Sequence, residues 1–196
     1  MLKNKVMWQD ALFIGTIAFF VLSLINIALG LLGFVCALTP FYLAYRYREK
    51  VWCKKYCPRA SLFSKLLKRI SFGLKPPEGL YSDKTKRFIL NFFCINLVMI
   101  SYSTLAVAAL KAPPMDYVRF LMLFKMPFEL PQLIQLTLPT SVIHLSYRVF
   151  SIMFSSTIVG LILGIMYRPR SWCAICPVNT LTGVMIERNM QKKAVS

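Results

Sequence analysis

One cysteine motif occurs twice in this chain and constrains its fold more than any other feature. The first copy runs from Tyr47 to Pro58 and the second from Tyr167 to Pro177. Both read Tyr-Arg, then a basic residue and Trp-Cys, and two or three residues later Cys-Pro. Ser61-Leu62 and Thr180-Leu181 continue the match at the same offsets after the prolines. Agreement over about fifteen positions indicates an internal repeat, so we expect the chain to fold as two related halves.

The composition predicts that both halves lie in a membrane. Of the 196 residues, 57% are hydrophobic and only 16% are charged. A soluble domain of this size cannot hide so much apolar surface, so the lipid bilayer must solvate it. We therefore predict an all-α membrane protein with about four transmembrane helices, and a single membrane domain over residues 1–196.

The apolar runs define the predicted spans. The first run, from Ala11 to Arg46, would make a helix of about 54 Å, which is too long for one crossing. We divide it at Gly30 to Gly33 into two short spans with a tight turn; the alternative is one long tilted helix broken at Pro40. In the first half (8–70) the predicted spans are about 11–29 and 31–46, and in the second half (87–186) they are about 88–110 and 146–167. Each half is predicted to end in a cytoplasmic Cys-Pro loop.

Two other stretches are predicted to lie at the membrane surface. Between Ser61 and Ile70, apolar and basic side chains fall on opposite faces, as is typical of an interfacial amphipathic helix. Residues 112–140 are apolar, but they contain two acidic and two basic side chains, with Pro127 and Pro131 in the middle. Burying such a charge at the centre of a bilayer costs about 2.5–3.5 kcal/mol. We therefore expect residues 112–140 to form an extracytoplasmic surface or re-entrant segment.

The positive charges predict the orientation. The net charge is +17, and all but four of the 24 Lys and Arg residues fall on the side of the cysteine motifs in this four-span arrangement. The four exceptions are Lys111, Arg119, Lys125 and Arg148. By the positive-inside rule, both motifs and both termini are cytoplasmic, in a multi-pass protein of the cell (inner) membrane. This distribution accounts for most of the charge without nucleic acid, for which the chain has no recognition motif.

The candidate metal ligands are Cys53, Cys57, Cys173 and Cys176. Two thiolate pairs, each at a turn, can make one four-sulfur site, which suits an iron–sulfur cluster, a structural zinc or a single iron. Proline directly after the second cysteine of each pair favours a cluster. Pro58 and Pro177 also suit the first turn of a helix, whose N–H groups and positive dipole end would face the anionic site. A disulfide framework is not expected in a reducing cytoplasm, and redox-active or unpaired cysteines are the remaining alternative.

The two pairs, Cys53-x-x-x-Cys57-Pro58 and Cys173-x-x-Cys176-Pro177, each follow a predicted span and resemble those of NapH/NosR-like membrane-bound 4Fe-4S proteins. The resemblance covers the membrane core. It implies that the four cysteines bind one [4Fe-4S] cluster and that the protein passes electrons between a quinone or cytoplasmic donor and a redox partner. The second pair is one residue shorter than is usual in those polyferredoxin-type relatives, and the chain shows neither their ferredoxin tail nor a flavin domain. The resemblance therefore implies the site but not the respiratory substrate.

Residues beside the motifs have two interpretations. Trp52 and Trp172 are expected to anchor the membrane interface, and the alternative is that they shield the metal site from water. Positive-inside topology accounts for most of the cations around the proposed site. So dense a cationic rim would also stabilise a reduced cluster and attract an acidic electron donor such as a ferredoxin or flavodoxin. The rim consists of Arg46, Arg48, Lys54, Lys55, Arg59, Arg168 and Arg170.

Three isolated residues are weaker candidates. Cys36 and Cys94 lie inside predicted spans at different depths. We therefore expect each to be buried as a small apolar residue rather than to form a second metal site. His144, the only histidine, lies near the outer mouth of the last span, as an interfacial residue or as part of a quinone or proton site. The stretch from Tyr117 to Leu138 is predicted to be a membrane-surface helix. The alternative is that this stretch binds a quinone or a partner subunit.

The predicted function is one-electron transfer by a subunit of an anaerobic respiratory or redox complex. The chain offers no catalytic triad, phosphate loop or paired carboxylates, so an electron carrier is favoured over a stand-alone catalyst. One cluster at one face cannot carry an electron across about 30 Å of hydrocarbon, so other redox subunits or a quinone must complete the path. The alternatives are a structural or assembly subunit with zinc or a redox-inert site, and a cytoplasmic redox sensor.

Overall fold

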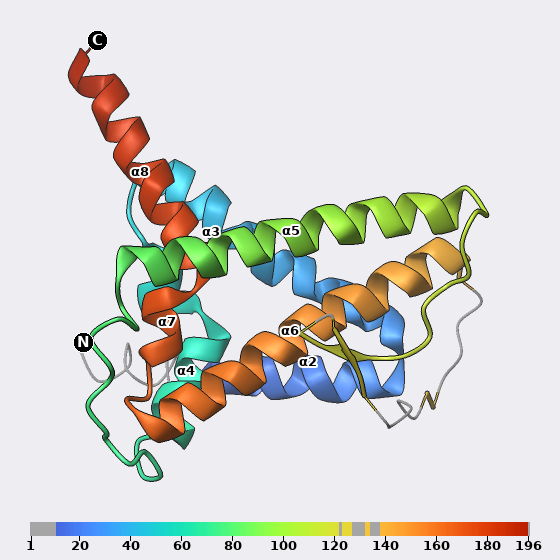
Figure 1. The fold of residues 1–196 in the computed structure, drawn as a ribbon, viewed down its shortest axis with the longest axis horizontal. Coiled ribbons are helices and arrows are strands. Elements are labelled where there is room, and N and C mark those ends of the chain that lie inside the picture. The colour runs from blue at the N-terminus through green and yellow to red at the C-terminus, as the bar shows by residue number, and fades with distance from the viewer. Residues whose placement is uncertain (1–10, 122, 127–131, 134–137, 196) are drawn as a thin grey trace. The chain divides into compact units, whose positions relative to one another are not determined.

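The structure, a computed structural model, is mostly helical, which confirms the predicted class of secondary structure. It describes residues 11–121, 123–126, 132–133 and 138–195. The elements in these residues are α2 (Phe13–Ile25), the 3₁₀ turn η1 (Ile27–Leu31), α3 (Leu32–Tyr47), the π-helical turn η2 (Trp52–Tyr56), α4 (Pro58–Leu66), α5 (Asp83–Ala108), β1 (Arg119–Phe120), β2 (Phe124–Lys125), α6 (Thr140–Met166), α7 (Ser171–Ile175) and α8 (Pro177–Val195) (Figure 1).

Among the residues that the structure describes, three helical segments are long and apolar enough to cross a membrane: Ile27–Tyr47, Asp83–Ala108 and Thr140–Met166. Each overlaps a predicted span but begins several residues earlier. Helices α5 and α6 begin with polar residues that do not belong to the apolar run, whereas Ile27–Tyr47 begins earlier because η1 continues directly into α3. Helix α2 has 13 residues, whereas a crossing takes about 20. The structure therefore supports a membrane protein with three candidate spans, and a fourth crossing stays a prediction.

The first apolar run turns at Asn26. The side chain of Asn26 accepts a hydrogen bond from the backbone N–H of Ala28 at 2.8 Å and so caps η1. Gly33, which we expected in the turn, lies inside α3 instead. A Cβ built on Gly33 would lie 2.7 Å from Val149 Cγ1, so this glycine allows α3 to pack closely on α6. Helix α3 also continues through the buried Pro40 rather than ending there.

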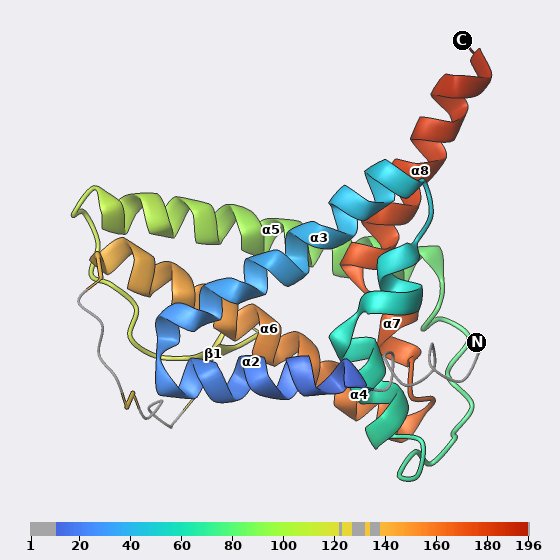
Figure 2. The same ribbon diagram turned by 180° about the vertical axis from the view of Figure 1, so that it is seen from behind.

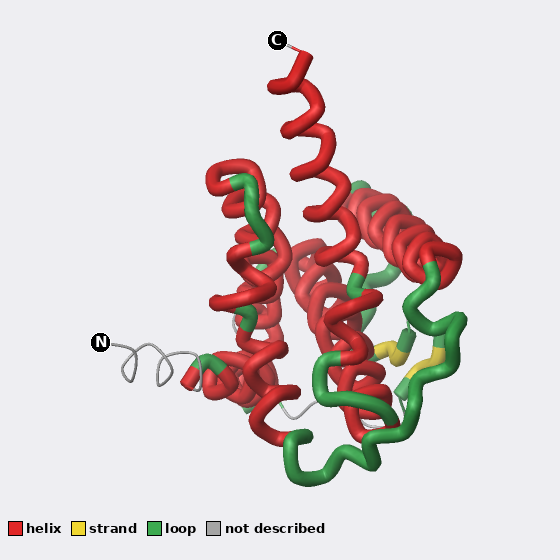
Figure 3. Tube along the Cα trace, turned by 90° about the vertical axis from the view of Figure 1, so that its left-hand side faces the viewer, coloured by secondary structure: helices red, strands yellow, loops and turns green. Residues whose placement is uncertain are grey.

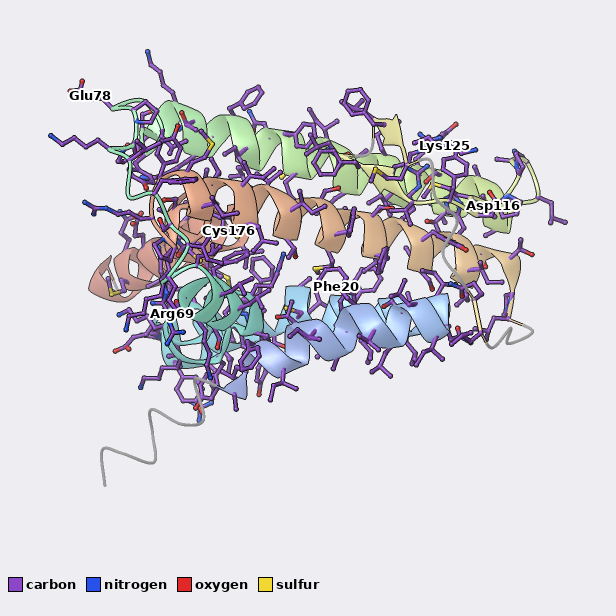
Figure 4. All side chains as sticks on the ribbon, turned by 90° about the horizontal axis from the view of Figure 1, so that it is seen from below. Phe20, Arg69, Glu78, Asp116, Lys125 and Cys176 are labelled. Carbon is purple, nitrogen blue, oxygen red and sulfur yellow. The ribbon has the colours of Figure 1, made fainter. Side chains whose placement is uncertain are left out.

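The described residues of 17–35 and 93–158 form one compact unit. Its core consists of Ile27, Met115, Val118, Tyr147 and Phe150. The ring of Phe20, on α2, packs edge to face against Phe150 and Phe154 of α6, with centroids 5.8 and 6.4 Å apart (Figure 4). Aromatic packing therefore joins α2 to α6 within this unit.

The segment that follows α5 lies along α6 in the same unit. Its backbone N–H groups donate to side chains of α6: Met115 to His144 Nδ1 at 2.9 Å, Arg119 to Ser151 Oγ at 3.1 Å and Leu121 to Ser155 Oγ at 2.8 Å. We call residues 115–121 the strap. These bonds satisfy backbone groups that no helix or sheet pairs.

The predicted surface helix over 117–138 is replaced, in its described part, by two short strands. β1 and β2 pair antiparallel, with Arg119 opposite Lys125 and Phe120 opposite Phe124 (Figure 3). Residues 122, 127–131 and 134–137 of this prediction lie outside the described residues. No candidate span occurs in the described part of 112–139. That residues 112–140 form an extracytoplasmic surface or re-entrant segment stays a prediction.

The described residues of the second compact unit are 11–16, 36–92 and 159–195, and they include both cysteine motifs. Helix α4 packs on α6 here. Phe63 and Leu67 are almost fully buried, and they occupy the space above Gly160 and Gly164, where a Cβ would collide with each ring or methyl group. Small residues four apart are the usual means by which two helices approach closely within a membrane.

The prediction of an interfacial helix over residues 61–70 is therefore partly wrong. The helix ends at Leu66, and two apolar side chains of this stretch, Phe63 in the helix and Leu67 just after it, are buried against protein. Only Leu66 and Ile70, which are 49% and 54% exposed, keep the outward position that an interfacial helix would give them.

The linker after α4 connects the first motif to the second. Phe72 N–H donates to Ile165 O at 2.8 Å, and Ser71 Oγ donates to Tyr167 O at 3.0 Å. These bonds satisfy carbonyls at the end of α6 that have no partner within the helix. Arg170 Nε donates to Ser64 Oγ at 2.8 Å, and α4 and α7 lie side by side in both ribbon views (Figures 1 and 2).

Candidate metal centre

Cys53 lies in the π-helical turn η2. The N–H of Cys57 donates to Trp52 O at 2.9 Å, which closes the wide turn. A π turn contains one residue more than an α turn. The first pair has three residues between its cysteines and the second pair has two, so the wide turn absorbs the extra residue of the first pair.

Cys57 and Cys176 occupy matching backbone positions. Each is extended, with ψ 112° and 129°, and each directly precedes a helix that begins with proline. The carbonyl of Cys57 accepts from Ser61 N–H at 3.2 Å, and that of Cys176 accepts from Thr180 N–H at 3.0 Å. The local geometry of the two motifs therefore agrees as the repeated sequence predicts, although the organisation of the whole chain as two repeated halves stays a prediction.

The four thiols of the two motifs influence one another. Burial, and then the neighbouring thiols of Cys57 and Cys176, raise the pKa of Cys53 to about 11. Burial raises the pKa of Cys173 to about 12, with added contributions from the other three thiols. Two motifs far apart in the sequence therefore share one half-buried neighbourhood in which an unliganded thiol stays protonated.

Three cations lower the pKa values of these thiols and so oppose the effect of burial. Lys50 and Arg59 lower the pKa of Cys53, and Arg170 lowers that of Cys173. Lys50 also connects the two motifs, since a Cβ built on Gly183 of α8 would lie 2.8 Å from Lys50 Nζ. Arg59 and Arg170 belong to the predicted cationic rim, whereas Lys50 was not included in it.

The start of α8 provides further polar groups. The thiol of Cys176 accepts hydrogen bonds from the backbone N–H groups of Val178 and Asn179, which partly oppose the rise in its pKa caused by burial. Asn179 Nδ2 donates to Cys173 O at 2.9 Å. Two free N–H groups of a proline-initiated helix are therefore directed at Cys176, whose side chain is labelled in Figure 4.

The donor set, four cysteine thiols, suits an iron–sulfur cluster. Among the residues that the structure describes, no three Cys, His, Asp or Glu side chains are close enough to hold one metal ion. The four thiols nevertheless lie within electrostatic range of one another. A cluster is wider than one ion, so its thiolate ligands stand farther apart, and sulfur is the donor that it requires. That these four cysteines are ligands stays a prediction.

Other predicted candidates lie elsewhere. Cys94 is exposed on α5, in the other unit. His144 is buried there with both ring nitrogens engaged, because Nδ1 accepts from Met115 N–H and Nε2 lies 3.2 Å from Ser103 Oγ. This pattern indicates the tautomer with the proton on Nε2. A structural role therefore accounts for His144. Trp52 and Trp172 are half-buried beside the first cysteine of each pair.

Cys36 is the residue whose position the sequence reasoning missed. It belongs to the unit that contains both motifs, and its thiol is hydrogen-bonded to the side chain of Arg59. Its place in an apolar run gives no sign of this contact. The one available signal is the break in the repeat after the prolines, where Arg59 corresponds to Val178.

The chain matches the sequence model of a family described as a 4Fe-4S binding domain over residues 29–77 and 150–193. Each matched segment contains one of the two cysteine motifs. Together the segments cover just under half of the chain. The match supports an iron–sulfur protein family. No curated protein and no solved structure matches the chain.

Proposed function

We propose that this protein is a membrane-integral electron-transfer protein that holds one [4Fe-4S] cluster with Cys53, Cys57, Cys173 and Cys176. The observation that carries the proposal is the shared electrostatic neighbourhood of thiols from two motifs that lie far apart in the sequence. The match to a 4Fe-4S binding domain, which includes both motifs, supports the identity of the cofactor. Three apolar helices support a place in the membrane.

The residues around the thiols have distinct roles in this proposal. A bound [4Fe-4S] cluster would supply reversible uptake of one electron. Arg59, Lys50 and Arg170 offset the negative charge of the thiolates, and the N–H groups at the start of α8 hold Cys176. Burial of the thiols limits the access of water. No residue needs to move a proton, so the protein is a carrier rather than a stand-alone catalyst.

We further propose that the site receives electrons at the cytoplasmic face within a larger redox complex. Lys54 and Lys55 are exposed next to Cys53, and such cations would steer an acidic donor such as a ferredoxin or flavodoxin to the site. A hydrocarbon layer of about 30 Å separates this face from the other. A second redox subunit, or a quinone in the membrane, would therefore complete the path.

The test is metal and acid-labile sulfide analysis of anaerobically purified protein, with EPR spectra before and after reduction by dithionite. The proposal expects about four irons and four sulfides per chain and a signal that develops on reduction and disappears on reoxidation. Zinc in place of iron would support a structural or assembly role. A cluster that is lost on brief exposure to air, without reversible reduction, would support a redox sensor.

The donor side has its own test. Replacing Lys54 and Lys55 together by Gln should slow reduction by an acidic ferredoxin and flatten the dependence of that rate on ionic strength, because the steering charges are gone. Reduction by dithionite at saturating concentration provides the control for cluster integrity. Unchanged kinetics with the ferredoxin would exclude this surface as the docking site.

A further inference from the structure

The two halves of the candidate centre stabilise their thiols in different ways. In the second half, backbone N–H groups of Val178 and Asn179 donate to the thiol of Cys176. In the first half, the side chain of Cys57 makes no such capping hydrogen bond at the start of α4. The sequence repeat is broken at the same place, since Arg59 follows Pro58 where Val178 follows Pro177.

Arg59 lies where it can replace the missing amide donors. It is half-buried in the first turn of α4. Its guanidinium interacts electrostatically with Cys57 from its own motif and with Cys176 from the other motif. A charge placed between ligands of both motifs acts on the whole four-thiol site rather than on one cysteine.

Cys36 is a hydrogen-bond partner of this guanidinium. The side chains of Arg59 and Cys36 are hydrogen-bonded, and Cys36 lies on helix α3 rather than in a loop. Arginine presents several N–H donors in a planar group. One donor can therefore bind Cys36 while the charge remains near the ligands of both motifs.

We propose that Arg59, held in place by Cys36, is the positioning residue that raises the reduction potential of the centre, and that Cys36 is not a ligand. This inference rests on the proposed cluster at the four motif cysteines. Reduction adds one negative charge to the centre, and a fixed positive charge in a half-buried site stabilises that state. Removing the charge should therefore lower the potential.

The test is a redox titration of the membrane-solubilised protein, followed by the EPR signal of the reduced centre. Arg59→Gln should shift the midpoint to a more negative potential, so that the ratio of reduced to oxidised centre at a fixed potential falls on the order of tenfold. Arg59→Lys should retain most of the wild-type value. Lys68→Gln is the matched control, because it removes one exposed charge just after α4 and outside the cationic rim, and solvent screens that charge.

Variants of Cys36 test whether Cys36 holds Arg59 in place. They can be measured even if the Arg59 variants do not fold. Cys36→Ser retains an acceptor and should change little. Cys36→Ala releases the guanidinium and should shift the midpoint in the same direction as Arg59→Gln, but less. In the double variant Cys36→Ala/Arg59→Gln, the shift should equal that of Arg59→Gln alone, because Cys36 acts through Arg59.

The outcomes separate this inference from the proposed function. Wild-type protein without iron or an EPR signal would overturn both. A wild-type centre whose midpoint responds to Arg59→Gln no more than to Lys68→Gln would overturn the role of Arg59 and leave the cluster intact. Loss of iron in Cys36→Ser and Cys36→Ala alike would make Cys36 a ligand and overturn its assignment as an anchor. If the Arg59→Gln protein does not retain iron, its midpoint cannot be measured. In that case, a Cys36→Ala midpoint equal to that of the wild type would overturn the inference.

Discussion

At the scale of single residues, the cysteines of the candidate centre differ from ordinary thiols because they are partly buried beside one another. Burial and the neighbouring thiols favour the neutral form of Cys53 and Cys173. A thiol must lose its proton to bind iron, so loading of this centre releases protons. The same physical effect makes the metal-free protein sensitive to alkaline pH.

The pH dependence of the metal-free protein follows from the raised pKa of Cys53. A group whose pKa is raised by folding binds its proton more tightly in the folded state, so its contribution to stability is lost as pH rises from the usual thiol range to about 11. The midpoint of thermal unfolding in detergent should therefore fall over this window, and it should fall less in Cys53→Ser. Equal losses in both proteins would show that the Cys53 thiol makes no such contribution.

At the scale of elements, the close contact between α4 and α6 holds the first motif in place. Gly160→Ala would put a methyl group into the ring of Phe63. Such overpacking costs about 1–3 kcal/mol. We expect a lower unfolding temperature and a lower iron content after purification, because α4 begins directly after Cys57.

Gly79→Ala is the control for this contact, because no atom lies within 4 Å of a Cβ at Gly79. It should leave both the unfolding temperature and the iron content at wild-type values. If Gly160→Ala behaved like Gly79→Ala, the packing of α4 on α6 could not be what positions the first motif.

The strap depends on side chains of α6 as hydrogen-bond acceptors. Ser155→Ala would leave the N–H of Leu121 without its partner, at a cost of about 1–3 kcal/mol if water cannot replace it. Hydrogen exchange at Leu121 should become faster, and removal of Ser151 should have the same effect at Arg119. Ser101→Ala, which removes a hydroxyl bonded only to its own helix in the described contacts, should leave both exchange rates unchanged.

The sequence predicts these elements where the physical pattern is local. The repeat of Trp-Cys and Cys-Pro predicted the turns and the two proline-initiated helices, because proline and the helix start are coupled through backbone geometry. The apolar runs predicted the three long helical segments but not their starts. Hydropathy does not record the polar first turns of α5 and α6, and it cannot show that η1 continues into α3.

The parts that the sequence could not predict depend on tertiary contacts. The burial of Phe63 against Gly160 requires that two helices far apart in the chain meet, and an amphipathic pattern is equally compatible with a membrane surface. The contact of Cys36 with Arg59 is of the same kind. The strap on α6 was also missed, because backbone N–H groups that bind side-chain acceptors leave no periodic signal in the sequence.

At the scale of the whole molecule, exposed apolar side chains are the main feature of the helices. On α5, Ile95, Val98, Tyr102 and Leu105 are all more than 60% exposed. A soluble protein would hide these side chains, whereas lipid covers them without cost. The helices therefore match a bilayer environment, in agreement with the composition.

The proposed orientation can be tested with reporter fusions. Fusions at residue 75 and after the C-terminal residue should both report a cytoplasmic location, and an insertion at residue 112 should report the opposite side. A fusion before residue 11 distinguishes three crossings from four, because a cytoplasmic N-terminus requires that α2 crosses. A reporter at residue 75 on the side opposite the C-terminus would contradict a shared site at one face.

The central claim is that two distant motifs hold one cluster, and it is tested most directly by serine variants from opposite motifs. Iron content and the EPR signal of the dithionite-reduced protein should be measured in Cys53→Ser, Cys176→Ser and, as a control, Cys94→Ser. The account predicts about four irons per chain in the wild type and in Cys94→Ser, with loss of the wild-type signal in each of the other two. Half of the iron retained in each motif variant, with an unchanged signal, would mean that each motif binds metal separately and would contradict the account.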